Sequence, residues 1–288
     1  LIPDTRYYYR IRYLLNNSTG NYISGAEHFF QTQRKSTATF SFVVEADPHL
    51  DSNTNPDAYK LTLQHMLSKK PDFIIDLGDN IMSDKLPVVD QTSIVNRTLL
   101  FRQYFNEITH SVPLYVTLGN HEGELGWLPN TSISSLPTMA GLIRKRYFPN
   151  PYPNKFYSGN TIPEANVGIR ENYYAWEWGN ALFIVIDPYW YTMQKPGATS
   201  GWYWTLGKTQ YDWLKKTLET STAKFKFMFA HQIVGGDADG RGGVEFANLY
   251  EWGGNNLDGT PGFATNRPGW YKPIKDLLIL FLAPSAAM

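Results

Sequence analysis

The sequence lacks cysteine, long apolar runs and an excess of charge of either sign. Without cysteine the chain cannot form disulfides, a thiol nucleophile or a cysteine zinc site, although this absence does not fix the compartment. No stretch approaches 18 uninterrupted apolar residues, so we expect no membrane span. The 26 basic and 26 acidic residues cancel, which leaves no bulk field for nucleic acid. Any phosphate must therefore be recognised by a local site.

The 288 residues, 42% of them apolar, are enough for one large domain or for one domain plus a small extra piece. Aromatic residues make up 15% of the chain, which is typical of strand-rich cores and binding loops. This content is the only support for a carbohydrate-binding or adhesive function. The chain starts at Leu1 without a basic-then-apolar leader, so a signal peptide is expected to be absent or already removed.

The first 36 residues have a different pattern from the rest. Residues 6–14 and the run that ends at Thr32 are rich in β-formers and are separated by turn residues, which predicts a hairpin. Two strands are too few to be stable alone. The hairpin is therefore either the end of a sandwich or a hairpin docked on the main domain.

From residue 39 onward, strand and helix patterns alternate. Strands are predicted at 40–44, 71–77 and 113–118, with helices near 57–69 and 91–107 between them, which indicates a layered α/β core. Residues 123–170 are rich in Pro, Gly, Asn and Ser and predict a long insertion at the mouth of a pocket. Further on, we predict paired strands at 173–178 and 181–186, a helix at 208–219, a strand at 225–230, Gly-rich loops and a short apolar tail.

Polar residues follow the carboxyl ends of these predicted strands, at the edge where open α/β sheets bind ligands. Carboxylate, imidazole and amide oxygen groups are ligands of hard and borderline metals. One such residue at a strand end is usually an ordinary turn or a structural histidine, but their joint occurrence in this order predicts a metal site. The residues are Asp47, His49, Asp79, Asn120, His121 and His231.

The motifs around these residues resemble the signature of the calcineurin-like metallophosphoesterases, and the Gly-Asn-His-Glu run is similar to the purple acid phosphatase branch. They are Asp47-Pro48-His49, Gly78-Asp79-Asn80, Gly119-Asn120-His121-Glu122 and Ala230-His231. The resemblance implies a four-layer α/β/β/α sandwich over residues 37–288, preceded at 1–36 by a remnant of a fibronectin-like β domain. It also implies an extracellular or periplasmic protein.

The same resemblance implies a dinuclear centre of iron, manganese or zinc with no organic cofactor. Asp47 and His49 would bind the first metal, Asp79 would bridge, and Asn120 and His231 would bind the second. His121 would act as an electrostatic clamp or as a general acid. The implied reaction is hydrolysis of a small-molecule phosphate ester by a metal-activated water. For Asp76 two roles stay open, supporting the ligand loop or facing the neighbouring helix, and we expect the second.

Two departures from the family pattern bear on activity. Met82 stands where the purple branch has its iron-bound tyrosine, which argues against a tyrosinate–iron site. No histidine follows His231, so the final Gly-His-x-His motif is missing and the catalytic domain is predicted to be C-terminally incomplete. The alternative function is therefore an inactive remnant that keeps the fold and binds metal or phosphate weakly.

The loop after His231 offers few substitutes for the missing imidazoles. Asp237 or Asp239 is a possible replacement ligand, and Arg241 is a candidate contact for a substrate phosphate. A missing edge strand would leave backbone groups unpaired, so we also predict self-association through a sheet edge.

Overall fold

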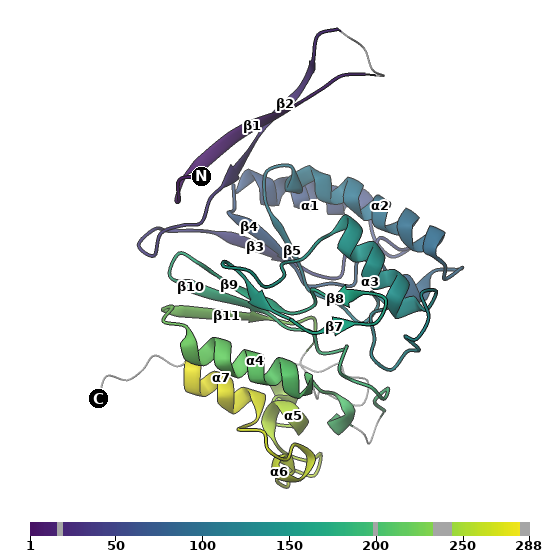
Figure 1. The fold of residues 1–288 in the computed structure, drawn as a ribbon, viewed down its shortest axis with the longest axis vertical. Helices are drawn as coiled ribbons and strands as arrows, with labels where there is room; N and C mark the ends of the chain where they lie inside the picture. Colours follow the sequence, from purple (N-terminus) through teal and green to yellow (C-terminus); the bar gives the residue numbers. More distant parts are fainter. Residues whose placement is uncertain (16–19, 198–200, 233–243, 283–288) are drawn as a thin grey trace.

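Two stacked sheets lie between layers of helices in the computed structural model, which describes residues 1–15, 20–197, 201–232 and 244–282 (Figure 1). The first sheet is parallel, in the order β3 (Phe42–Glu45), β4 (Phe73–Asp76), β5 (Leu114–Val116). Helices α1 (Pro56–Ser68) and α2 (Gln91–Thr109) connect its strands and cover its outer face. The mixed α/β class predicted from the alternating pattern is confirmed.

Both connecting helices start at residues that suit a helix N-terminus. The Asn55 side chain accepts hydrogen bonds from the backbone N–H groups of Asp57 and Ala58, and Pro56 occupies the first helical position. Asp90 caps α2 in the same way through the N–H of Ser93. These caps fix where each helix begins, and so where the preceding loop at the sheet edge ends.

The second sheet is mixed, in the order β11 (Phe225–Phe229), β10 (Ala181–Val185), β9 (Tyr174–Trp178), β6 (Ser158–Gly159). The antiparallel pair β9–β10 turns at Gly179-Asn180 as predicted. Helix α4 (Gly207–Thr220) leads from β10 to its parallel neighbour β11.

Side chains of alternate residues on each strand build the layers. In β10, Phe183 and Val185 pack between the sheets, whereas Leu182 and Ile184 pack with residues of α4 and of the C-terminal helix α7 (Ile274–Leu282). The space between the sheets is filled largely by aromatic rings, and Trp176 stacks on Tyr115 with the ring centroids 4.0 Å apart. This aromatic layer packs the two sheets against each other.

The predicted insertion at 123–170 is more ordered than its composition indicates. It contains α3 (Leu136–Tyr147) and the short strands β6, β7 (Pro163–Glu164) and β8 (Gly168–Ile169). Pro137 lies in the first turn of α3, where proline is tolerated, so it starts this helix rather than breaking it. Ile143 of α3 packs against Phe101 and Phe105 of α2.

The remaining described elements are short. They are the 3₁₀ helices η1 (Ser83–Lys85), η2 (Gly201–Tyr203) and η3 (Val244–Phe246), and the helices α5 (Tyr250–Gly253) and α6 (Phe263–Asn266). The predicted apolar tail instead begins as helix α7. Among the described residues, no helix combines the length and apolarity that a membrane crossing needs.

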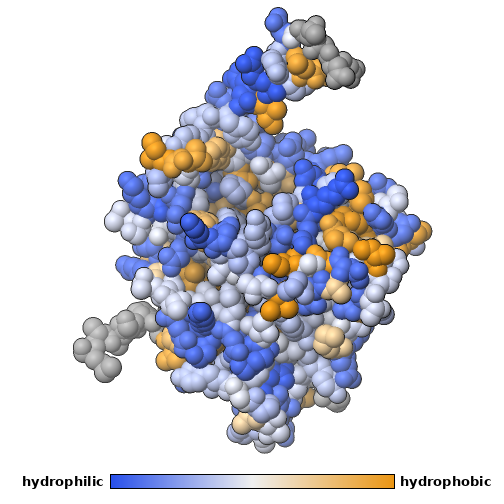
Figure 2. Space-filling model, viewed as in Figure 1, coloured by the Kyte–Doolittle hydropathy of each residue, from blue (hydrophilic) through white to orange (hydrophobic). Residues whose placement is uncertain are grey.

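The N-terminal hairpin consists of β1 (Arg6–Tyr13) and β2 (Ile23–Gln31), as predicted. It touches the main body where the Tyr9 hydroxyl donates to the His110 carbonyl at 2.5 Å, and the segment after it docks through the Arg34–Asp72 ion pair at 2.8 Å. Its far end projects away from the body with apolar side chains exposed, among them Ile11 and Leu15 (Figures 1 and 2). Its relation to a fibronectin-like domain and its self-association stay predictions.

Candidate metal centre

Asp79 lies at the middle of the predicted site, directly after β4. Gly78 and Asp79 have φ angles of 98° and 59°, which turn the chain sharply at the end of the strand. One carboxylate oxygen, Oδ1, accepts a hydrogen bond from the His121 backbone N–H at 2.8 Å. The other, Oδ2, lies 3.7 Å from His49 Nε2 and 3.4 Å from His231 Nε2. One oxygen is thus held by the protein, and the other is near two imidazoles.

The Asp47–His49 loop contributes an imidazole and a second carboxylate. His49 Nε2 lies 3.5 Å from Asp47 Oδ1, is buried and has no hydrogen-bond partner. The ligand atoms of Asp47, His49 and Asp79 all lie within 4.8 Å of one another. A buried nitrogen without a partner beside two carboxylates is what a metal site needs before the ion binds, so these three residues fit a metal.

His231 and Asn120 form a second set of candidate ligands near Asp79. His231 Nδ1 lies 2.9 Å from the Leu77 carbonyl oxygen, which can only accept, so this nitrogen carries a proton. The opposite nitrogen, Nε2, is 3.1 Å from Asn120 Oδ1, which also accepts a hydrogen bond from Gln232 Nε2. In neutral His231, Nε2 would present a lone pair to a metal.

Without a metal, His231 and Asp79 behave as an ion pair. Burial lowers the pKa of His231, but the hydrogen bond and negative charge of Asp79 outweigh it and raise that pKa to about 9. Burial raises the pKa of Asp79, and the hydrogen bond and charge of His231 outweigh it, so that pKa is lowered. A metal at this position would therefore compete with a proton on His231.

His121 is oriented by a carboxylate from a different segment. Its Nδ1 lies 2.9 Å from both oxygens of Asp84 in η1. The hydrogen bond to Asp84 raises the pKa of His121 against the opposing effect of burial. Asp84 was not identified from the sequence, because its distance from His121 along the chain gives no sign of contact.

Glu122 is a second residue whose role the sequence did not reveal, although it ends the Gly-Asn-His-Glu motif. Its buried carboxylate accepts backbone hydrogen bonds from Gly119 at 2.5 Å, Asn80 at 2.7 Å and Asp79 at 3.0 Å. Burial and the nearby charge of Asp79 raise the pKa of Glu122 to about 7, against the N–H donors. Glu122 ties the loops after β4 and β5 together.

Asp76, the last residue of β4, holds the loop that carries Asp79. Its Oδ1 accepts from the Gly78 N–H at 2.9 Å and from Asn80 Nδ2 at 2.5 Å, so the expectation that it merely faces the neighbouring helix is wrong. Burial and the nearby charge of Glu45 raise the pKa of Asp76, and Glu45 accepts a hydrogen bond from the Tyr59 hydroxyl of α1 at 3.2 Å. The residues flanking Asp79 are thus fixed by buried carboxylates.

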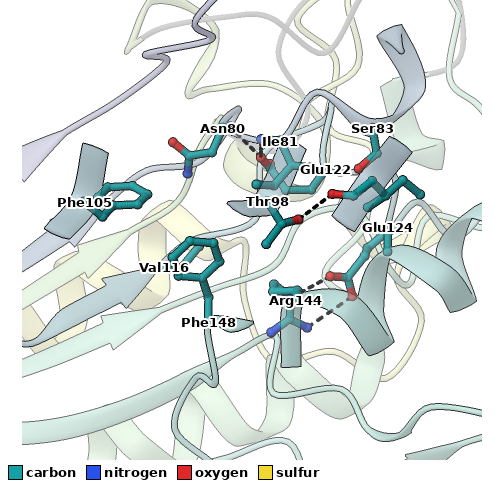
Figure 3. Close-up of a pocket in the computed structure, with 12 residues that line it drawn as sticks. Asn80, Ile81, Ser83, Thr98, Phe105, Val116, Glu122, Glu124, Arg144 and Phe148 are labelled. Carbon is teal, nitrogen blue, oxygen red and sulfur yellow. Dashed lines mark hydrogen bonds and ion pairs between the residues drawn. The ribbon is translucent and has the colours of Figure 1, made fainter. Parts of the chain in front are cut away.

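A cavity of about 20 Å³ is bordered by the polar residues Asn80, Glu122, Glu124 and Arg144 and by apolar side chains that include Phe105 and Val116 (Figure 3). Glu124 pairs with Arg144 of α3 at 2.5 Å and with the buried Arg170 at 2.5 Å. A cavity of this size is large enough for about one water molecule. The Glu124–Arg144 ion pair beside this partly apolar cavity therefore joins the segment after Glu122 to α3.

The other predicted residues fall into two groups. Met82, which replaces the tyrosine of the purple branch, precedes η1 in the left-handed conformation and brings no phenolate to the site. Arg241, Asp237 and Asp239 lie outside the described residues, so their roles stay predictions.

Residues 40–257 match the family model described as calcineurin-like phosphoesterase. The chain belongs to the calcineurin-like phosphoesterase family. The fold of this calcineurin-like phosphoesterase is similar to that of a purple acid phosphatase, PPD1, from yellow lupin (Lupinus luteus) seeds, with a TM-score of 0.57 and 17% identity. It is also similar to PhoD, with a TM-score of 0.51 and 20% identity.

The alignments cover 96% and 79% of the calcineurin-like phosphoesterase chain, but only 42% of the lupin protein and 47% of PhoD. The chain therefore spans less than half the length of either structure. No curated protein matches its sequence.

Proposed function

We propose that this protein hydrolyses small-molecule phosphate esters with a dinuclear metal centre. The observation that carries the proposal is the position of Asp79 Oδ2, 3.7 Å from His49 Nε2 and 3.4 Å from His231 Nε2. A single oxygen near two imidazoles from different strands suits a ligand shared by two ions. Family membership supports the same chemistry.

In this proposal Asp47 and His49 hold one ion, Asn120 and His231 hold the other, and Asp79 is shared. Iron, manganese and zinc all accept this set of oxygen and nitrogen ligands. Bound ions would supply Lewis acidity and lower the pKa of an attacking water. Asp79 Oδ1 stays on the His121 N–H, so the protein leaves only Oδ2 free to be shared.

His121 is the proposed proton donor or electrostatic clamp for the leaving group. Asp84 accepts from Nδ1 and so fixes the ring, which leaves Nε2 as the nitrogen that can hold or release a proton. The backbone N–H of the same residue anchors Asp79. His121 would thereby link the position of the proton donor to that of the shared ligand.

The test is metal content and hydrolysis of p-nitrophenyl phosphate and its bis ester by Asp79→Asn. We expect two ions in the unsubstituted protein and a loss of turnover of at least about 100-fold in the variant, because an amide is a poor shared ligand. Asp212→Asn, at an exposed pair on α4, is the control and should match the unsubstituted protein. Turnover that survives Asp79→Asn would contradict the proposal.

A second candidate is a catalytically impaired protein that binds one ion. One observation favours it: among the described residues, His49 Nε2 is a buried imidazole nitrogen without a partner, whereas His231 Nε2 already lies beside Asn120 Oδ1. One ion per chain and no turnover on either ester would support this candidate.

A further inference from the structure

The loop that carries Asp47 and His49 has an unusual backbone conformation. Asp47, His49 and Leu50 have φ angles of 54°, 47° and 49°. The Leu50 N–H donates to the Pro48 carbonyl two residues earlier, which makes a tight turn centred on His49. Residues other than glycine rarely adopt this region, and they keep it only where their surroundings hold them there. Contacts from outside the loop must therefore stabilise it.

Arg97 of α2 provides such contacts. One guanidinium nitrogen, Nη2, donates to the His49 carbonyl, and the other, Nη1, donates to the Leu50 carbonyl at 3.2 Å. The two acceptors belong to adjacent residues of the left-handed turn. A planar group with two fixed N–H directions can therefore hold both carbonyls in one orientation.

Among the described residues the guanidinium forms no ion pair with a carboxylate, and its Nε is buried without an acceptor. Burial lowers the pKa of Arg97 against the opposing charge of nearby Asp51. The guanidinium carbon lies 5.1 Å from the ring centroid of Phe101, which is fully buried on the same helix. The Phe101 ring therefore supports the guanidinium, while the two carbonyls of the turn accept its hydrogen bonds.

We propose that Arg97 is a positioning residue for the metal centre, because it holds the turn that directs His49 Nε2 toward Asp79 Oδ2. The inference rests on the proposed function, since it assigns Arg97 to the loop that would hold the first ion. Arg97 itself touches neither the ion nor the substrate.

Arg102 is a matched control on the same helix. Its Nη1 donates to the Tyr147 carbonyl, and its guanidinium carbon lies 5.8 Å from the Phe148 ring centroid. It thus makes the same kinds of contact, in a more exposed setting, with a segment that carries no predicted ligand. A general effect of arginine on α2 would appear equally at both positions.

The experiment compares Arg97→Lys and Arg102→Lys by calorimetric titration of the metal-free protein with MnCl₂. Lysine keeps the charge but replaces the fixed fork with a single flexible group. We expect Mn²⁺ affinity to fall by about 10- to 100-fold in Arg97→Lys, the range for residues that orient metal ligands, and to stay unchanged in Arg102→Lys. Arg97→Gln takes the place of the lysine variant if that variant fails to fold.

Hydrogen exchange of the amides at 46–54 in the metal-free proteins gives a readout that needs no metal. Faster exchange in Arg97→Lys alone supports the inference. Equal Mn²⁺ affinity in Arg97→Lys and the unsubstituted protein would overturn it and leave the metal centre standing, as would equal weakening in both lysine variants. If the unsubstituted protein binds none of Mn²⁺, Zn²⁺ and Fe²⁺, the proposed function fails, and unchanged exchange in Arg97→Lys would then overturn this inference separately.

Discussion

The ligand loops after β3 and β4 are held in different ways. Asp79, after β4, has a side chain only 4% exposed, and its backbone N–H binds the buried Glu122 carboxylate. Asp47, after β3, has a side chain 49% exposed, and Arg97 holds two carbonyls of its loop. The loop is also held by the Asp47 N–H on the Gly78 carbonyl and by the Thr54 hydroxyl on the Pro48 carbonyl but, among the described residues, by no buried carboxylate like Glu122. The protein therefore buries Asp79, the proposed shared ligand, and leaves Asp47, of the proposed first ligand pair, near the surface. We therefore expect substitutions that disturb the β4 loop to lower the stability of the protein, and substitutions in the β3 loop to lower its metal affinity with little loss of stability.

The largest expected effect on folding comes from Glu122→Gln, because Glu122, after β5, holds the loop after β4. An amide group would place an N–H₂ against the backbone donors of Gly119, Asp79 and Asn80 and leave some of them without an acceptor. We expect the free energy of unfolding of the metal-free protein to fall by about 2 to 4 kcal/mol in urea titrations. Glu219→Gln, at a surface pair on α4, should change it by no more than about 0.5 kcal/mol. Equal changes in the free energy of unfolding for Glu122→Gln and Glu219→Gln would show that the buried Glu122 carboxylate does not hold the β4 loop more firmly than a surface contact would.

A smaller, pH-dependent effect is expected beneath both loops, at Glu45. Burial raises its pKa to about 7 in the folded protein, above the ordinary value of 4.5, although the hydrogen bonds with Asp76 and Tyr59 oppose it. A raised folded-state pKa means that this stability is present below pH 4.5 and is lost as the pH rises through 7. In Glu45→Gln the side chain stays neutral and can still accept from Tyr59.

We therefore expect Glu45→Gln to be more stable than the unsubstituted protein at pH 8, by about 1 to 3 kcal/mol, and close to it at pH 5. Urea unfolding at the two pH values measures the difference. The same fall in stability from pH 5 to pH 8 in both proteins would show that Glu45 does not hold this proton.

The smallest effect is expected at the β3 loop, with Asp47→Gly. Glycine adopts the left-handed conformation at no steric cost, so the metal-free protein should become more stable by about 0.5 to 1 kcal/mol while Mn²⁺ binding weakens. Asp79→Gly is the matched change, because Asp79 also has a positive φ, but it removes the acceptor of the His121 N–H and should destabilise. Urea unfolding in the presence of a chelator measures both. Destabilisation by Asp47→Gly would mean that the β3 loop is supported as firmly as the β4 loop.

Much of this arrangement could be predicted from the sequence, because it depends on local patterns. Alternating strand and helix patterns predicted the layered α/β core, and polar residues at the strand ends predicted which side chains would meet at the edge of its sheet. The structure brings Asp47, His49, Asp79, Asn120 and His231 to that edge. Their roles as ligands remain part of the proposed function.

The residues that hold the ligands could not be predicted in the same way. Glu122 binds N–H groups more than 40 residues earlier, and Arg97 reaches a loop 48 residues earlier. Such contacts follow from how helices and loops pack, and no spacing along the chain encodes them. Helix α3 was missed because the segment around it is rich in proline, glycine, asparagine and serine, although proline at its start is compatible with a helix.

The positive φ angles of Asp47 and Asp79 restrict which amino acids can replace them without strain in the backbone. Asparagine tolerates the same backbone conformation and keeps one oxygen, so it is the replacement that least disturbs either turn. Replacement by asparagine would nevertheless remove the charge that a metal requires. A related protein that lost its activity through such replacements would keep the backbone conformation of both loops while losing the negative charge of the site.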